Sequence, residues 1–157
     1  MWRRTVDGAT REEFIVEGSI NTAGSVVEWL VRMGLLPQVE QLDRAAGAGR
    51  PDAVGFLPAL AGLGSPHHDP AARGRLEGLS LDTTAADVVR AALAGIAGRV
   101  AELTRHMGIV GALRVDGGLS RSRVMCAEVA AATGLELIVA DDPETALAGA
   151  AAVAAGG

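Results

Sequence analysis

The sequence contains no lysine, no tyrosine and a single cysteine, and aromatic residues make up only 3% of its 157 residues. One cysteine excludes an internal disulfide, and the scarcity of aromatics leaves alanine, valine, leucine and glycine to fill the interior. No uncharged apolar stretch approaches the length of a membrane-spanning helix, and the amino terminus carries no charged-then-apolar signal pattern. We therefore expect a cytoplasmic protein that has no membrane partner.

What is present is typical of one globular domain. Hydrophobic residues make up 49% of the chain and charged residues 21%, which excludes a disordered protein, and the length is sufficient for a real core. All fourteen basic residues are arginine, and the formal net charge is -5. A negative chain has no general attraction to the phosphates of nucleic acid, so we expect no nucleic-acid partner.

Apolar periodicity and turn residues predict an α/β domain. A β-hairpin opens the chain, with strands at residues 2–6 and 12–16. Glycine, proline and alanine predict a long ordered loop over residues 58–73. Further helices are predicted at residues 21–33, 38–46, 84–107, 120–133 and 143–155, and further strands at residues 53–57, 75–79, 110–115 and 135–139. Because strands and helices alternate in the second half, we expect a mostly parallel sheet flanked by helices.

The segment from Leu113 to Ser122 has the pattern of a nucleotide site. An apolar strand ends at Asp116, turns on Gly117 and Gly118 and opens a helix. Glycines let the backbone approach a ligand closely, and the free N–H groups at a helix start favour polar or anionic ligand atoms. Alone, this pattern is weak, because two glycines between a strand and a helix are more often plain connection chemistry.

Several other residues invite a chemical role, and for each a structural explanation is favoured. The His67–Asp69 segment is expected to be loop rather than a metal site, since adjacent side chains diverge. We interpret Asp116 as a strand-end acid that orders the turn rather than as a general base. Cys126 is interpreted as a buried structural thiol. Arg121 and Arg123 are near enough to the helix start to reach phosphates, but the solvated-surface interpretation comes first.

Five ordered segments cover nearly the whole chain and share one pattern. They are Glu17–Ile20 with Ala23–Ser25 and Trp29–Leu30; Phe56–Pro66 running into Asp69–Pro70; Gly74, Leu76, Gly78 and Leu79 followed by Asp87, Val88 and Ala91–Leu93; Arg114–Gly118; and Glu144–Thr145 with Gly149–Ala151. Together they resemble the carboxy-terminal half of the FGGY carbohydrate kinases, most closely the glycerol kinase branch. Ala94 departs from this pattern, because it replaces an acidic or amide position at the end of the third segment.

The resemblance implies an actin-like ATPase domain of the ribonuclease-H-like type. Kinases of this family transfer the γ-phosphoryl of ATP, with Mg²⁺, to a hydroxyl of a polyol or sugar held between two such domains, mainly by positioning and charge stabilisation. In the family, the catalytic base and the Gly/Thr-rich phosphate loop precede the part that this chain matches, and closing helices follow it. Residues 1–157 are therefore expected to form a partial carboxy-terminal domain, inactive alone, with no catalytic residue and no Mg²⁺ ligand of its own.

The resemblance also implies which residues contact ATP or ADP. Glu28 stands where the glycerol kinase branch has a glutamine near ATP, and it adds a negative charge that weakens phosphate binding. Ser122 replaces an asparagine that hydrogen-bonds the adenine, and a hydroxyl is shorter and has one donor. The implied nucleotide-binding residues are Gly24, Glu28, Gly117, Gly118, Leu119 and Ser122.

Other functions stay open at this point. The chain is alternatively a non-catalytic nucleotide-binding or interaction module, or the remnant of a truncated kinase gene. A dinucleotide-binding Rossmann unit is disfavoured, because no Gly-x-Gly-x-x-Gly follows a predicted strand. The identity of the polyol or sugar substrate is not encoded in the segments that match, and a homo-oligomer is compatible with the sequence.

Overall fold

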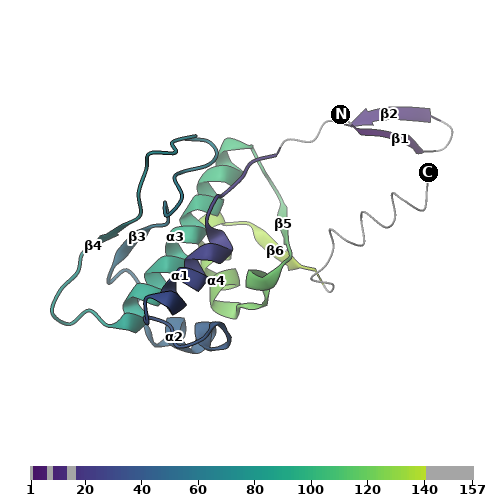
Figure 1. Ribbon diagram of the computed structural model, residues 1–157. Helices are drawn as coiled ribbons and strands as arrows, with labels where there is room; N and C mark the ends of the chain where they lie inside the picture. The colour runs from purple at the N-terminus through teal and green to yellow at the C-terminus, as the bar shows by residue number, and fades with distance from the viewer. Residues whose placement is uncertain (1, 7–8, 14–16, 141–157) are drawn as a thin grey trace.

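The computed structural model describes residues 2–6, 9–13 and 17–140, and of the first two ranges the backbone alone (Figure 1). Its elements follow one another as β1 (Trp2–Val6), β2 (Ala9–Glu13), α1 (Ala23–Arg32), the 3-10 helix η1 (Val39–Gln41), α2 (Leu42–Ala48), β3 (Gly55–Leu57), β4 (Arg75–Glu77), α3 (Ala85–His106), β5 (Ala112–Val115), the 3-10 helix η2 (Gly118–Arg121), α4 (Arg123–Thr133) and β6 (Glu136–Val139). The predicted helix at residues 143–155 lies outside the described residues.

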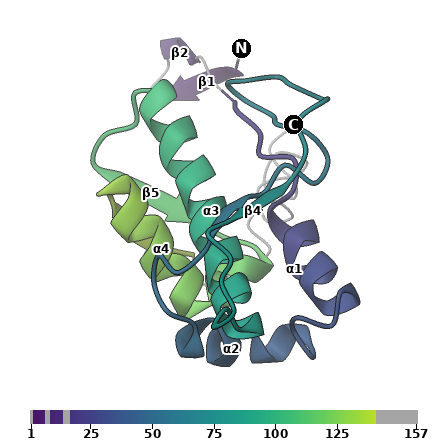
Figure 2. The same ribbon diagram turned by 90° about the vertical axis from the view of Figure 1, so that its left-hand side faces the viewer.

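Helix α3 is the centre of the molecule, with α1, α2 and α4 around it (Figure 2). It begins at a capping box, in which the Thr84 hydroxyl accepts from Asp87 N and the Asp87 carboxylate accepts from Thr84 N. Val89, Leu93 and Ile96 lie in its buried stripe, as the spacing of apolar residues predicts. The core around this stripe is made of Val26, Val27, Leu30, Leu36, Leu42, Ala46, Val88, Val89, Ala92, Leu93, Ile96, Ala97, Met125 and Val129.

Strands β5 and β6 pair in parallel on one side of α3, whereas β3 and β4 lie on the other side (Figure 1). The register runs from Ala112 opposite Glu136 to Val115 opposite Val139. Parallel neighbours need a crossover connection, and α4 supplies it. In this strand–helix–strand unit, the glycine turn lies between β5 and α4.

The sheet is less parallel than the alternation of elements predicts. The described strands form three two-stranded sheets, and of these only β5–β6 is parallel. β3 and β4 pair antiparallel, from Gly55 opposite Glu77 to Leu57 opposite Arg75, because a loop without a helix joins them and returns the chain in the opposite direction. β1 and β2 also pair antiparallel, and β2 begins at Ala9, earlier than the predicted second strand at residues 12–16.

Two predicted helices are divided in the structure. The predicted helix at residues 38–46 is a short η1 turn followed by α2, and the predicted helix at residues 120–133 is η2 followed by α4. In the second case Ser122 separates the two, because its backbone is extended (φ -78°, ψ 117°) and its side chain caps α4. Within the described ranges, no helix combines the length and apolarity needed to cross a membrane.

The loop between β3 and β4 is held at several points to the helices on either side. The Thr22 hydroxyl donates to Pro58 O, and Ser65 N donates to Ser19 O over 3.0 Å. From α3, the Arg99 guanidinium donates to Ser65 O over 2.9 Å. These bonds hold the loop between β3 and β4 against the start of α1 and against α3.

Candidate functional site

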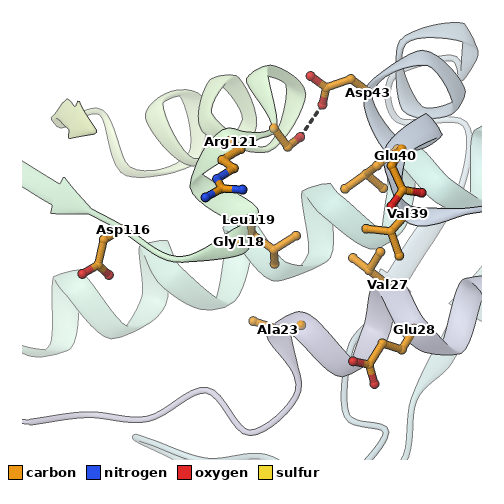
Figure 3. A pocket seen from close by; sticks show the side chains of 13 residues that line it. Ala23, Val27, Glu28, Val39, Glu40, Asp43, Asp116, Gly118, Leu119 and Arg121 are labelled. Carbon is orange, nitrogen blue, oxygen red and sulfur yellow. Dashed lines mark hydrogen bonds between the residues drawn. The ribbon is translucent and has the colours of Figure 1, made fainter. Parts of the chain in front are cut away.

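A cavity of about 740 Å³ lies where α1, the η1–α2 segment and the β5–α4 connection meet (Figure 3). Three segments far apart in the sequence line it. They contribute Ala23, Gly24, Val27 and Glu28 from α1; Val39, Glu40, Leu42 and Asp43 from η1 and α2; and Asp116, Gly118, Leu119, Arg121 and Ser122 from the β5–α4 connection.

The first turns of α1 form one wall of this cavity. Helical spacing places Gly24 and Glu28 on the same face, beside Val27. A Cβ atom at Gly24 would meet no atom within 4 Å, so the missing side chain leaves open space on the cavity side. Val26, Val27 and Leu30 of this helix are buried in the core, which fixes the helix in place.

The glycine turn after β5 forms the facing wall. Gly117 has a φ of 85°, a conformation that favours glycine, and its carbonyl accepts from Ser120 N over 3.1 Å and from Ser120 Oγ over 2.7 Å. These bonds fix η2, on which Gly118 and Leu119 border the cavity. Gly117 does not line the cavity and acts by making the turn, unlike the other nucleotide-binding residues that the resemblance implies.

The hydroxyl of Ser122, where the resemblance implies an adenine contact, is hydrogen-bonded within the protein. It donates to Asp43 Oδ1 and accepts from Met125 N over 3.0 Å, and the residue is 7% exposed. The single donor of the hydroxyl is thus used inside the protein. Arg123 N donates to Asp43 Oδ2 over 2.9 Å, so an acid of α2 and the cap serine together satisfy the start of α4.

Asp43 is a wall residue that the sequence does not single out, because 79 positions separate it from Ser122. Burial alone would raise the pKa of its carboxyl. Hydrogen bonds from Ser122 and from the N–H groups of Arg123 and Val124 outweigh burial and hold the pKa below its usual value. Asp43 therefore stays ionised and engaged with α4.

The charges around the cavity are mainly negative. Glu28, Glu40 and Asp116 line it and are exposed, in addition to Asp43, whereas Arg121 is the one cation among the lining residues. Glu40 and Arg121 were not among the expected site residues. The sequence signal for Arg121 is its place near the predicted helix start, whereas Glu40 has only a place beside apolar positions that fold onto the same cavity.

The described residues hold no group of three or more His, Cys, Asp or Glu side chains that could bind a metal ion. His67 Nε2 instead lies 2.5 Å from Glu102 Oε1 on α3, and Asp69 Oδ1 accepts from Ala71 N over 2.9 Å. Burial first, and the charge of Asp43 second, raise the pKa of the Cys126 thiol, which makes it a poor nucleophile.

Comparison with known proteins identifies the family of this chain. Residues 1–156 match the FGGY family of carbohydrate kinases, C-terminal domain. The chain belongs to this family. It is 38% identical to a glycerol kinase of Bordetella parapertussis over 160 residues and 41% identical to a glycerol kinase of Rhodopirellula baltica over 155 residues. These alignments cover 98% and 94% of this chain, but 32% and 29% of the two relatives.

Solved structures agree on the fold. The glycerol kinase of Plasmodium falciparum, crystallised with ADP, is 30% identical with a TM-score of 0.73, over 80% of this chain and 26% of that protein. A xylulose kinase of Rhodospirillum rubrum is 25% identical with a TM-score of 0.66, over 78% of this chain and 27% of that protein. The chain thus has the α/β, actin-like fold of the FGGY kinases and spans about a third of the length of the curated relatives.

Proposed function

We propose that this chain is part of an ATP-dependent phosphotransferase that moves the γ-phosphoryl of ATP to a hydroxyl of a polyol or sugar, with glycerol as the first candidate. In this proposal residues 1–157 are part of the carboxy-terminal domain, whose complete sheet is mostly parallel. The matched relatives are about three times as long as this chain, so the rest of the site, the Mg²⁺ ligands included, belongs to other segments. The chain alone is then inactive.

The cavity supports the nucleotide part of this proposal. Gly24 and Glu28 lie far in sequence from Gly118 and Leu119, and the two pairs line one space. The small and apolar residues among the lining suit a flat, largely apolar ring. We assign the adenosine end of ATP or ADP to this space, with Gly117 shaping the turn and Ser122 holding the wall rather than donating to the base.

Calorimetric titration with ADP tests the nucleotide assignment. A Cβ atom at position 24 would meet no atom within 4 Å, so a Gly24→Leu variant, whose side chain would take up space in the cavity, should fold and lose measurable ADP binding. Gly98→Leu is the matched control, because Gly98 is exposed on α3, its Cβ would also meet open space, and it does not line the cavity. Absence of ADP binding by the unaltered chain contradicts the assignment.

Phosphoryl transfer needs a separate test, because a non-catalytic nucleotide-binding module is the second candidate. The acids at the cavity favour that alternative, since they would repel the phosphates that a kinase must hold but not an uncharged base. The chain should be mixed with the amino-terminal part of a related glycerol kinase and assayed for glycerol-dependent formation of ADP. Binding of ADP without turnover in this mixture supports the module, and the absence of both supports a gene remnant.

A further inference from the structure

The interior of the cavity lacks an aromatic partner for a base. Val27, Val39, Leu42 and Leu119 provide apolar surface, and no Phe, Trp or His belongs to the residues that line it. Bases are commonly held by stacking on an aromatic ring or on the plane of an arginine guanidinium. Among the lining residues, the guanidinium of Arg121 is the one cationic plane able to do this.

The backbone of Arg121 belongs to a hydrogen-bonded turn, whereas its side chain has no partner among the residues that the structure describes. The residue ends η2, and this turn is fixed by the hydrogen bond from Ser122 N to Leu119 O over 3.1 Å. Its guanidinium has no hydrogen bond or ion pair with any residue that the structure describes, whereas the guanidinium of Arg50 binds Asp87, that of Arg90 binds Glu128 and that of Arg99 binds Glu102. Figure 3 shows Arg121 on the η2 side of the cavity and Glu28 and Glu40 on the side of α1 and η1.

The charge of the cavity decides which part of a nucleotide faces Arg121. A polyphosphate inside it would lie among Glu28, Glu40 and Asp116, and each carboxylate would repel it. An uncharged ring meets no such repulsion and gains from the apolar walls. We propose that Arg121 is a specificity-determining residue that stacks its guanidinium on the nucleotide base, while the phosphates extend out of the cavity; this inference rests on the proposed function.

Substitution by lysine distinguishes stacking on a guanidinium from a simple charge contact. The guanidinium is planar and weakly hydrated, whereas a lysine ammonium is a compact, strongly hydrated point charge. Lysine at position 121 would therefore keep the charge and lose the plane. Adenosine, which has no phosphate, separates the two roles further, because a stacking residue contributes to adenosine and ADP alike.

The experiment is calorimetric titration of adenosine and of ADP into the unaltered chain and into Arg121→Ala, Arg121→Gln and Arg121→Lys. All three variants should weaken both ligands by the same factor, about five- to 150-fold for the loss of a stacking contact with a base, and lysine should not restore the affinity. The matched control is Arg44→Ala, which removes the same charge from an exposed side chain that does not line the cavity and should leave both affinities unchanged. Thermal denaturation of each variant checks that it is folded.

The other outcomes are distinguishable. If Arg121→Ala weakens ADP but not adenosine and lysine restores ADP binding, Arg121 contacts phosphate and the stacking proposal is overturned. If the Arg121 variants bind both ligands like the unaltered chain, the proposal is overturned and the nucleotide site stands. If the unaltered chain binds neither ligand, the proposed nucleotide site itself fails, and the role of Arg121 fails with it.

Discussion

The side chain of Ser122 is used within the protein itself. The resemblance implies an adenine contact there, but the hydroxyl bonds Asp43 and caps α4. A cap serine is recognisable in the sequence, since it directly precedes a helix. Its acidic partner is not, because the contact depends on α2 and α4 meeting in three dimensions.

The cap predicts a measurable loss of stability at this residue. Ser122→Ala should lower the free energy of unfolding by about 1 kcal/mol, the usual value for an N-cap, because Met125 N and Asp43 both lose a partner. Urea denaturation measures this as a lower midpoint at unchanged slope. Ser25→Ala, at an exposed position of α1, should stay within about 0.5 kcal/mol of the unaltered chain. Equal midpoints for the two variants would contradict the role of Ser122.

Local signals explain which elements the sequence could predict. The capping box at Thr84 and Asp87 and a sustained apolar stripe define α3, and its position is confirmed. The break between η2 and α4 is harder, because it depends on one extended residue inside an otherwise helical pattern. The pairing of strands is non-local: a strand of three residues such as β3 carries no signal for its partner. Likewise, the sequence predicts a turn at Gly117 and Gly118, but it does not show that Glu40 and Arg121 line the same cavity.

Two glycines of α3 allow a matched test of how this helix packs. A Cβ at Gly95 would lie 2.3 Å from Phe56 O of β3, whereas one at Gly98 would meet no atom within 4 Å. Gly95→Ala should therefore destabilise the chain by about 1 to 3 kcal/mol, the usual cost of overpacking. Gly98→Ala should stabilise it by about 0.5 to 1 kcal/mol, because alanine favours the helix. Urea denaturation compares the two, and a stable Gly95→Ala variant would mean that α3 and β3 can separate freely.

At the scale of the whole molecule, two carboxylates join segments that are distant in sequence. Asp43 connects α2 to α4, and Asp87, which is 1% exposed, connects α3 to the residue Arg50 after α2. The Arg50 guanidinium, together with the N–H groups of Arg50 and Thr84, holds the pKa of Asp87 well below its usual range. Both acids must stay ionised for these segments to remain joined.

Because the pKa values of Asp43 and Asp87 are lowered in the folded state, the stability of the whole chain should decrease in acid. A carboxyl whose pKa is lower in the folded state contributes stability that is complete above its unfolded pKa, about 3.9, and is lost as the pH falls below that value. We expect the urea midpoint to fall steeply between about pH 5 and about pH 2. Asp87→Asn should be less stable at neutral pH and show a shallower fall. Asp52→Asn, at an exposed position, should keep the original slope, and an equal slope for Asp87→Asn would contradict the assignment.

The anchored loop between β3 and β4 limits how this chain can change in length. Long surface loops usually accept inserted residues at little cost, since closing a slightly longer loop takes little extra entropy. Here the bonds to Ser19, Thr22 and Arg99 fix the spacing between Pro58 and Ser65. One added residue between those two positions would shift every later anchor by one place. Related sequences should therefore vary in length at residues 78–83, between β4 and α3, rather than between Pro58 and Ser65.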